Sequence, residues 1–494
     1  MNAPLPGRHS DEKASSAADS SAARLDVVIL ETPNLGDRSY VVGRGSQAIV
    51  IDPQRDIDRV LDVLEARGWN VTHVLETHFH NDYVSGGLQL ARTASAEYVV
   101  PAGMDIDFPA RRVEDSDVIE TGVGRIDVLL TPGHTPNHVS FAASGEHGHD
   151  ALFTGGSLLF SSVGRPDLLG PALTEPLARA QWKSMRRLAE LIDPKASVFP
   201  THGFGSFCSA TATVGNASTL GEQIAANPVF HTDQESFVAE LIVGLDAFPA
   251  YYAHMGPANQ SGAGAIDLSL PQRLDAPAIA EHLRSGAWVV DLRQRRLFSA
   301  RHVPGTLSFD VSGNAVTYLG WLIDWGTPVV LVGADENDIR LMQRELVRIG
   351  IDRPAGFAVG GPEDWALAGT HLASYPSINH EALAAEVAHD GRIGLLDVRR
   401  DSEFREGHIR GAKHVPLHEV RGRLPEIADW AKGSSGPVRV YCGTGFRAAV
   451  GCSVLAAAGV SVVHVDDDFP NAARAGLPIT RPSHQQLLGD TYAD

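Results

Sequence analysis

Cys442 begins a short glycine-containing loop between an apolar segment and a run of small residues. Residues 438–441 (VRVY) predict a strand, and residues 448–458 (AAVGCSVLAAA) predict a helix directly after the loop. Such a loop can turn successive backbone N–H groups towards an anion, and the positive end of the following helix adds to this effect. Both features favour a thiolate over a thiol at Cys442. Arg447, at the end of the loop, can hold an anionic sulfur donor such as thiosulfate or a persulfide.

The chemistry that this loop predicts is transfer of a sulfane sulfur through a persulfide on Cys442. We expect Cys442 and Arg447 to be catalytic, and the loop between them to bind the substrate through Gly443, Thr444, Gly445 and Phe446. A buried structural cysteine is the alternative interpretation.

Three histidines follow the ends of predicted strands in the first half of the chain. His78 and His80 follow the apolar segment 73–76, and His134 follows the segment 127–130. Two histidines separated by one residue on a loop can face one point, and a third from a neighbouring strand end completes a metal face. The sequence therefore predicts metal ligation, present or ancestral, by this trio.

The elements around these residues predict a multidomain α/β protein. From Leu25 to Val198, short apolar segments alternate with turns and a few helical stretches, which is typical of sheets covered by helices. One such helix is expected to end at Gly68. After this region of the chain, residues 251–265 contain Gly, Pro and Ser without periodicity, and we expect them to be an inter-domain linker.

An internal repeat follows this linker. Asp291, Arg293, Phe298, His302 and Gly305 recur at one constant spacing, as Asp397, Arg399, Phe404, His408 and Gly411. The repeat predicts two copies of one α/β unit. In the first copy, the loop after the corresponding strand, residues 333–338 (GADEND), has no cysteine and several acids. We therefore expect the first copy to be a structural or docking domain.

Composition excludes several classes of protein. The 494 residues suggest several domains, and 43% hydrophobic with 20% charged residues is ordinary globular usage. A net charge of −19 disfavours nucleic acid as a partner. No apolar stretch is long enough to cross a membrane, and three cysteines indicate free thiols in a reducing compartment, so we expect a cytoplasmic protein. Whether it forms a homo-oligomer stays open.

The C-terminal repeat resembles the rhodanese family. The motifs that carry the resemblance are the segment LLDVR (residues 395–399), the segment EFREGHIRGA (403–412), and the C-x-x-G-x-R loop from Cys442 to Arg447. Related phosphatases have one more residue in this loop, so the shorter loop here suits sulfur better than phosphate. The resemblance implies an inactive first domain, residues 266–375, and an active sulfurtransferase domain, residues 376–494.

Residues 25–250 resemble the metallo-β-lactamase superfamily, in the branch of persulfide dioxygenases and glyoxalase II. The resemblance implies an αββα sandwich after a disordered tail at residues 1–24. It implies five metal-ligand positions, which are His78, His80, Asp82, His134 and His202. It also implies that Arg165 binds the substrate. The superfamily's usual T-G-D segment is Thr154, Gly155 and Gly156 here, so the aspartate ligand is missing, and Tyr83 replaces a further histidine.

Two interpretations of this departure stay open. In the first, His80 replaces the carboxylate, and one Fe(II) or Zn(II) per chain is held by three neutral histidines. In the second, the site is vestigial and the domain only binds or docks. Cys208, six residues after His202, is either a sulfur-accepting thiol beside the same cleft or a packed small residue.

The domain order resembles the fused persulfide dioxygenase/sulfurtransferase proteins of bacterial sulfide detoxification. The resemblance implies an enzyme of hydrogen sulfide metabolism that transfers sulfane sulfur at Cys442 and oxidises a low-molecular-weight persulfide, such as that of glutathione, at the N-terminal site. Its partners would be small thiols, persulfides, thiosulfate or sulfite. The alternatives are a metal-dependent thioester hydrolase of the glyoxalase II kind with an attached rhodanese, and a non-catalytic scaffold.

Overall fold

The computed structural model describes residues 25–145, 148–311 and 313–481. The tail expected at residues 1–24 lies outside them. The chain divides into two compact units: unit 1 runs to Leu245 and includes Ala253–Ala265, and unit 2 comprises Asp246–Tyr252 and the chain from Ile266. No helix among the described residues has the length and apolar character that a bilayer span requires.

Unit 1 contains two sheets that pack face to face. One has six strands in chain order: β1 (Asp26–Thr32), β2 (Asp37–Arg44), β3 (Gln47–Ile51), β4 (Asn70–Leu75), β5 (Glu97–Pro101) and β6 (Arg111–Val113). The other has the order β13 (Ser197–Pro200), β10 (Gly148–Gly155), β9 (Val139–Gly145), β8 (Gly124–Leu130) and β7 (Val118–Thr121). A short hairpin of β11 (Leu158–Leu159) and β12 (Ser162–Val163) follows β10. The core between the sheets contains Tyr40, Phe141 and Phe153.

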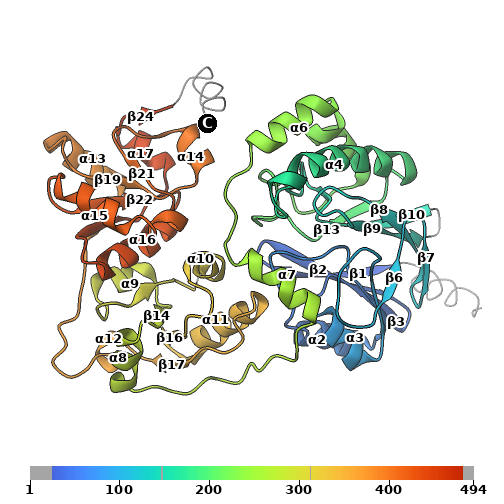
Figure 1. The fold of residues 1–494 in the computed structure, drawn as a ribbon, viewed down its shortest axis with the longest axis horizontal. Helices are drawn as coiled ribbons and strands as arrows, with labels where there is room; N and C mark the ends of the chain where they lie inside the picture. Colours follow the sequence, from blue (N-terminus) through green and yellow to red (C-terminus); the bar gives the residue numbers. More distant parts are fainter. Residues whose placement is uncertain (1–24, 146–147, 312, 482–494) are drawn as a thin grey trace, which may run out of the picture. The chain divides into compact units, whose positions relative to one another are not determined.

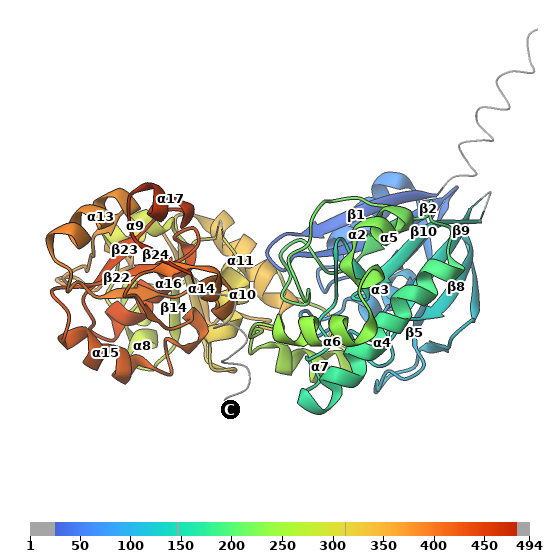
Figure 2. The same ribbon diagram turned by 90° about the horizontal axis from the view of Figure 1, so that it is seen from above.

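Helices cover both outer faces, which makes four layers (Figures 1 and 2). The first sheet packs on α2 (Asp58–Arg67) and α3 (Gly87–Ala94), and the second on α4 (Pro171–Leu191), α5 (Leu220–Ala226) and α6 (Gln234–Val243). Helix α2 ends at Gly68, whose φ of 64° is the left-handed conformation expected there. The αββα sandwich expected from the sequence is thus confirmed.

The segment expected to be a linker contains a helix instead. Helix α7 (Tyr252–Ser261) packs on unit 1 through Asn259, whose side chain donates to the carbonyls of His80 (2.9 Å) and Tyr83 (3.0 Å) and accepts from the Ser85 N–H (2.8 Å). Its sequence, YAHMGPANQS, contains Gly256 and Pro257 and so predicts no helix, but Tyr252, Met255 and Asn259 recur at helical spacing and are buried.

Unit 2 contains two parallel sheets flanked by helices, one for each sequence copy (Figure 1). The first copy has the strand order β15 (Leu307–Ser308), β14 (Trp288–Asp291), β16 (Val329–Gly333) and β17 (Gly356–Val359). Its helices are α8 (Ala276–Arg284), α9 (Arg295–Ala300), α10 (Ala315–Leu322), α11 (Glu336–Arg348) and α12 (Pro362–Trp365).

The second copy repeats this order as β21 (Lys413–His414), β19 (Leu395–Asp397), β22 (Val438–Tyr441) and β23 (Val462–Val465), and adds β18 (Ser377–Ile378). A separate pair joins β20 (His408–Ile409) to β24 (Ile479–Thr480). The helices are α13 (His380–His389), α14 (Asp401–Glu406), α15 (Leu424–Lys432), α16 (Phe446–Ala457) and α17 (Pro470–Arg474). The expected pair of α/β domains is therefore present.

The repeated residues make the same contacts in both copies. Arg293 holds Asp291 through Nε (2.9 Å) and a terminal nitrogen (2.6 Å), and Arg399 holds Asp397 in the same way (3.0 and 2.7 Å). The Nδ1 atom of His302 and that of His408 each bond the carbonyl of the phenylalanine four residues earlier, at 2.8 and 3.0 Å. The repeated residues thus make the same stabilising contacts after the corresponding strand in each copy.

Candidate thiol site and candidate metal centre

Cys442 lies where strand β22 ends and helix α16 begins. The Gly445 N–H donates to Cys442 Sγ over 3.2 Å, and Gly445, with a φ of 92°, turns the chain into the helix. The Cys442 side chain is 1% exposed, whereas Thr444 is exposed. The sulfur therefore lies beneath the solvent-facing rim of its loop, next to a backbone donor and a helix N-terminus.

Arg447 is held beside this loop by Glu403 of α14. Two parallel bonds join Arg447 to Glu403, at 2.5 and 2.7 Å. Burial alone would raise the pKa of Glu403, but Arg447 and then Arg400 outweigh it and lower that pKa to about 2. Glu403 is therefore ionised near neutral pH, and it fixes the guanidinium in the first turn of α16.

The first copy also contributes side chains around the Cys442 loop. Arg295 donates to Asp466 Oδ1 (2.7 Å) and to the Thr444 carbonyl (3.4 Å). The Tyr318 ring lies 5.9 Å from the Phe446 ring. Burial raises the pKa of Tyr318, and the positive charge of Arg447 opposes that rise, so the hydroxyl and the guanidinium are electrostatic neighbours. The cysteine-lacking copy thus forms part of the wall of the thiol site.

In the first copy, an acidic residue of the corresponding loop binds the N-terminus of the helix that follows it. Asp335 caps helix α11, and its carboxylate accepts from the N–H groups of Asn337 (2.8 Å) and Asp338 (3.3 Å). A carboxylate thus takes the helix N-terminus that the second copy offers to sulfur.

In unit 1 the strand-end histidines come together in one buried cluster. The ring centre of His78 lies 4.2 Å from that of His80, 4.9 Å from that of His134 and 5.1 Å from that of His202. His78 Nε2 and His202 Nε2 are 3.0 Å apart. Donor atoms lie within 4.8 Å of one another in several sets of three, including His78/His80/His202, His134/His202/Cys208 and Asp37/Asp82/His202. The described residues thus form a His/Asp cluster of the metal-binding kind.

Two of these histidines are each held between two carboxylates. His202 Nδ1 lies 2.9 Å from Asp37 and 3.1 Å from Asp82, while His80 Nε2 lies 3.0 Å from Glu76 and 3.4 Å from Asp52. Burial would lower both histidine pKa values, but the acids outweigh it, raising the pKa of His80 to about 9 and that of His202 to about 10. Asp37, Asp52 and Glu76 were not predicted. Glu76 directly follows strand β4, as His78 does two residues later, so its place at the end of that strand could have indicated it.

The other two predicted histidines are neutral nitrogen donors. Burial, followed by neighbouring histidines, lowers the pKa of His78, and burial and His202 lower that of His134 to about 3. His134 Nδ1 lies 2.9 Å from the Arg165 carbonyl, which leaves Nε2 buried and without a hydrogen-bond partner among the described residues. An orphaned imidazole nitrogen beside further donors fits one metal ion.

Gly156 marks the point where the structure departs from a two-metal site. A Cβ atom at Gly156 would lie 2.3 Å from His134 Cδ2, and one at Gly164 would lie 2.9 Å from His134 Cγ. The His134 ring therefore occupies the space that an aspartate at position 156 needs. Tyr83 stacks on His80 at 4.3 Å and contributes a buried hydroxyl instead of an imidazole.

Arg165 and Cys208 lie beside the cluster but differ in what they offer. The guanidinium of Arg165, 3% exposed, bonds both oxygens of Asp167 at 2.7 Å and the Phe207 carbonyl at 3.2 Å. Cys208 is fully buried. Burial would raise the pKa of Asp82, but His202, then His80 and last a hydrogen bond from the Cys208 thiol outweigh it and lower that pKa.

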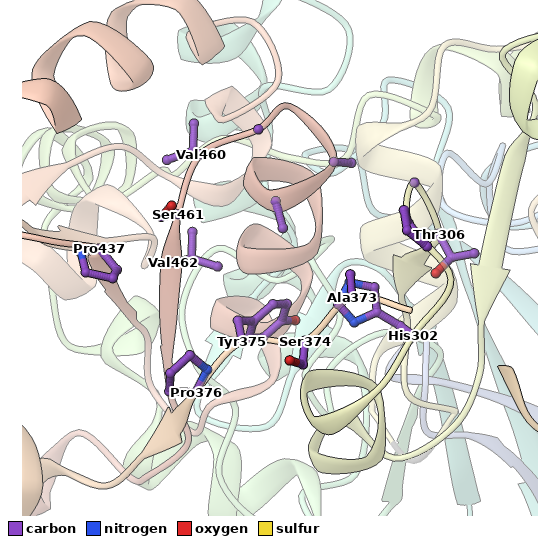
Figure 3. A pocket seen from close by; sticks show the side chains of 15 residues that line it. His302, Thr306, Ala373, Ser374, Tyr375, Pro376, Pro437, Val460, Ser461 and Val462 are labelled. Carbon is purple, nitrogen blue, oxygen red and sulfur yellow. The ribbon is translucent and has the colours of Figure 1, made fainter. Parts of the chain in front are cut away.

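Two cavities lie near these elements. One, of about 370 Å³, is lined by chain neighbours of the metal-site histidines, among them Phe79, Asn81 and Thr135. The other, of about 470 Å³, lies between the two copies of unit 2 and is lined by His302, Tyr375 and Val462, among others (Figure 3). The lining of this second cavity includes no residue of the Cys442–Arg447 loop.

Comparison with known proteins identifies two domain families in the chain. Residues 35–203 match the metallo-beta-lactamase superfamily, and residues 380–474 match the rhodanese-like domain. A hydroxyacylglutathione hydrolase of Methylococcus capsulatus is 31% identical over 252 residues, which cover 45% of this chain and 92% of that protein. A hydroxyacylglutathione hydrolase of Rhizobium meliloti is 31% identical over 180 residues, which cover 36% of this chain and 66% of that protein.

Among solved structures, a metallo-beta-lactamase from Staphylococcus aureus subsp. aureus COL is similar, with a TM-score of 0.61 at 26% identity, covering 68% of this chain and 99% of that one. Fold, cluster and loop define a metallo-β-lactamase domain joined to a rhodanese-like domain. The chain belongs to the metallo-beta-lactamase superfamily, and it carries the rhodanese-like domain towards its C-terminus.

Proposed function

We propose that the chain is an enzyme of sulfur metabolism whose second rhodanese-like copy transfers sulfane sulfur through Cys442. The observation that carries this proposal is the Gly445 N–H that donates to Cys442 Sγ at the start of α16. In the forward step, the Cys442 thiolate attacks the outer sulfur of thiosulfate, the S–S bond breaks, and sulfite leaves with the bonding pair. A nucleophilic acceptor then takes the terminal sulfur of the persulfide and regenerates the thiolate.

The test is thiocyanate formation from thiosulfate and cyanide. We expect Cys442→Ser to abolish it while the circular dichroism spectrum and melting temperature stay at wild-type values, because a hydroxyl keeps the loop's shape without the nucleophilic sulfur. Cys452→Ser, in the same helix, is the matched control and should retain transfer. A wild-type rate in Cys442→Ser would refute the assignment.

We further propose that the cluster of unit 1 holds one metal ion, Fe(II) or Zn(II), through His78, His134 and His202. Of the other two predicted ligands, Asp82 lies against His202 Nδ1, and His80 Nε2 lies between Glu76 and Asp52. Iron in the cluster would supply O₂ activation for oxidising a persulfide to a thiol and sulfite. The chain's own contribution is to present neutral nitrogens at His78 and His134 and to fix His202 between Asp37 and Asp82. The crowding at Gly156 disfavours a two-metal thioester hydrolase.

Metal content and oxygen uptake test this second activity. After anaerobic purification we expect one metal per chain, and oxygen uptake with a persulfide that is lost in His134→Ala. Two metals per chain with thioester hydrolysis would support the hydrolase instead. Oxygen uptake that is absent, or unchanged in His134→Ala, would support a scaffold role for unit 1.

A further inference from the structure

Cys208 lies close to two of the proposed metal ligands. Its sulfur and one nitrogen each from His134 and His202 lie within 4.8 Å of one another. All three side chains are fully buried. Bonds of about 2.0–2.3 Å from nitrogen and sulfur to a tetrahedral metal ion place neighbouring donor atoms roughly 3–4 Å apart. The spacing of this set is therefore compatible with one shared ion.

The backbone of Arg165 holds Cys208 and His134 side by side. Its N–H donates to the Cys208 carbonyl (2.9 Å), and its own carbonyl accepts from His134 Nδ1 (2.9 Å). The Cys208 N–H donates in turn to Ser206 Oγ (3.2 Å). The thiol and the imidazole are thus positioned by the same short piece of backbone.

The histidines of the cluster direct their Nε2 atoms to the metal position. His78, His134 and His202 each use Nδ1 for a contact of 2.8–2.9 Å with a neighbouring protein oxygen. His78 Nε2 and His202 Nε2 are 3.0 Å apart, and His134 Nε2 is buried without a hydrogen-bond partner among the described residues. A fixed Nδ1 leaves Nε2 as the metal donor. The Cys208 sulfur therefore lies beside nitrogens that are aimed at one ion.

The cluster lacks the anionic ligand that an aspartate at position 156 would supply. The His134 ring fills that space, since a Cβ atom at Gly156 would lie 2.3 Å from its Cδ2. Asp37 and Asp82 both face His202 Nδ1, at 2.9 and 3.1 Å. Neutral imidazoles leave the charge of a divalent ion uncompensated, whereas a thiolate offsets part of it and binds zinc and iron well.

We propose that Cys208 is a further metal ligand, whose thiolate replaces the aspartate that is missing at position 156. The inference rests on the metal ion proposed for unit 1 and adds one sulfur to its imidazole donors. On binding, the thiol gives its proton to solvent and the sulfur donates an electron pair to the metal, so neither changes oxidation state. The hydrogen bond from the thiol to Asp82 is exchanged for the bond to the metal.

Cobalt(II) loading of the full-length protein tests this ligand by spectroscopy, without turnover. The chain has three cysteines, so the Cys442→Ser/Cys452→Ser variant keeps Cys208 as its one thiol. After chelator treatment and anaerobic titration, this variant should bind one Co(II) per chain. It should then show a thiolate-to-cobalt charge-transfer band in the near ultraviolet beside the visible d–d bands, because imidazole and carboxylate ligands give no such band.

Cys208→Ser in the same background is the matched comparison, because it removes the sulfur and keeps the size of the side chain. We expect it to lose the charge-transfer band and keep d–d bands. Its affinity for Co(II) should fall by about tenfold or more, since even the loss of a group that only orients a ligand costs that much. Cys208→Ala should behave alike, and circular dichroism checks the fold of each variant. An unchanged Co(II) affinity in both variants would overturn the proposal.

The outcomes separate this inference from the functions beneath it. One Co(II) per chain without the charge-transfer band would refute the sulfur ligand and leave the histidine site standing. No bound Co(II) would refute the metal site and the inference with it. The band with one Co(II) per chain, in a protein whose iron form consumes no persulfide, would refute the oxidation and support the ligand.

Discussion

Single residues decide the chemistry of both sites. Glu403 holds Arg447 in a fixed position beside Cys442, and Gly156 leaves room for the His134 ring. Neither residue is itself a nucleophile or a predicted ligand, so their effects are best measured through stability, pH and metal content.

The Arg447–Glu403 pair predicts a pH-dependent stabilisation. A carboxyl whose native pKa lies near 2 instead of 4.5 binds fewer protons when folded, so its stabilisation is present above pH 4.5 and is lost as the pH falls towards 2. Glu403→Gln should therefore lower the unfolding free energy at pH 7 by up to about 3 kcal/mol, and the difference from wild type should shrink at pH 3.5. Urea unfolding at both pH values measures this. Glu406→Gln, exposed on the same helix, should show no such trend, and a pH-independent difference for Glu403→Gln would contradict the prediction.

Gly156→Asp is predicted not to rebuild a two-metal site. The new Cβ atom would press on His134, so the variant should lose about 1–3 kcal/mol of stability and should not gain a second metal. Thermal unfolding and elemental analysis check both statements. Gly156→Ala, which adds the same Cβ atom without a carboxylate, should be destabilised to a similar degree. A stable Gly156→Asp variant with two metals per chain would show that the His134 ring moves aside.

At the scale of elements, strand ends and helix starts place the reactive groups. Parallel strands direct their carboxyl ends to one edge, so loops such as those after β4 and β22 gather side chains there. Helix α7 acts differently, because it lines the cavity of about 370 Å³ that includes Phe79 and donates a hydrogen bond to the loop that carries His80.

The bracing by Asn259 predicts how α7 and the histidine loop are coupled. Asn259→Ala removes three hydrogen bonds and leaves the His80 and Tyr83 carbonyls and the Ser85 N–H without this partner. We expect a loss of about 2–3 kcal/mol and faster hydrogen exchange at Ser85 and along α7. Ser261→Ala, on the exposed end of the same helix, should leave the exchange at Ser85 unchanged. Unaltered exchange in Asn259→Ala would mean that other contacts hold the helix.

At the scale of the whole molecule, the two rhodanese-like copies of unit 2 work as one structure. Asp466 of the second copy accepts from Arg295 and Arg296 of the first, and a Cβ atom at Gly445 would lie 2.4 Å from its Oδ1. The first copy, whose corresponding loop has no cysteine, therefore supports the loop of the second.

A double-mutant cycle on Arg295→Ala and Asp466→Ala measures this support. We expect a coupling free energy of about 1–2 kcal/mol, and a higher KM for thiosulfate in either single variant, because the Thr444 carbonyl and Gly445 lose their neighbours. Asp468→Ala, exposed two residues further on, is the control and should not couple to Arg295. Additive effects of the two changes would show that the contact between the copies does not support the loop.

Local residue patterns predicted the repeat and the loop from Cys442 to Arg447, and a family resemblance predicted the αββα sandwich. Periodicity, Gly68 and the recurring Asp–Arg and Phe–His pairs are local signals, and neighbours in the chain satisfy them.

Which side chains meet in the sites could not be predicted from the sequence. The pairing of His202 with Asp37, the ring of His134 against Gly156, and the approach of Arg295 and Tyr318 to the Cys442 loop join residues far apart in the chain. Helix α7 was not predicted for the same reason, since Asn259 bonds the histidine loop, which lies far away in the chain. Such contacts depend on how strands and helices pack, and no local pattern records them.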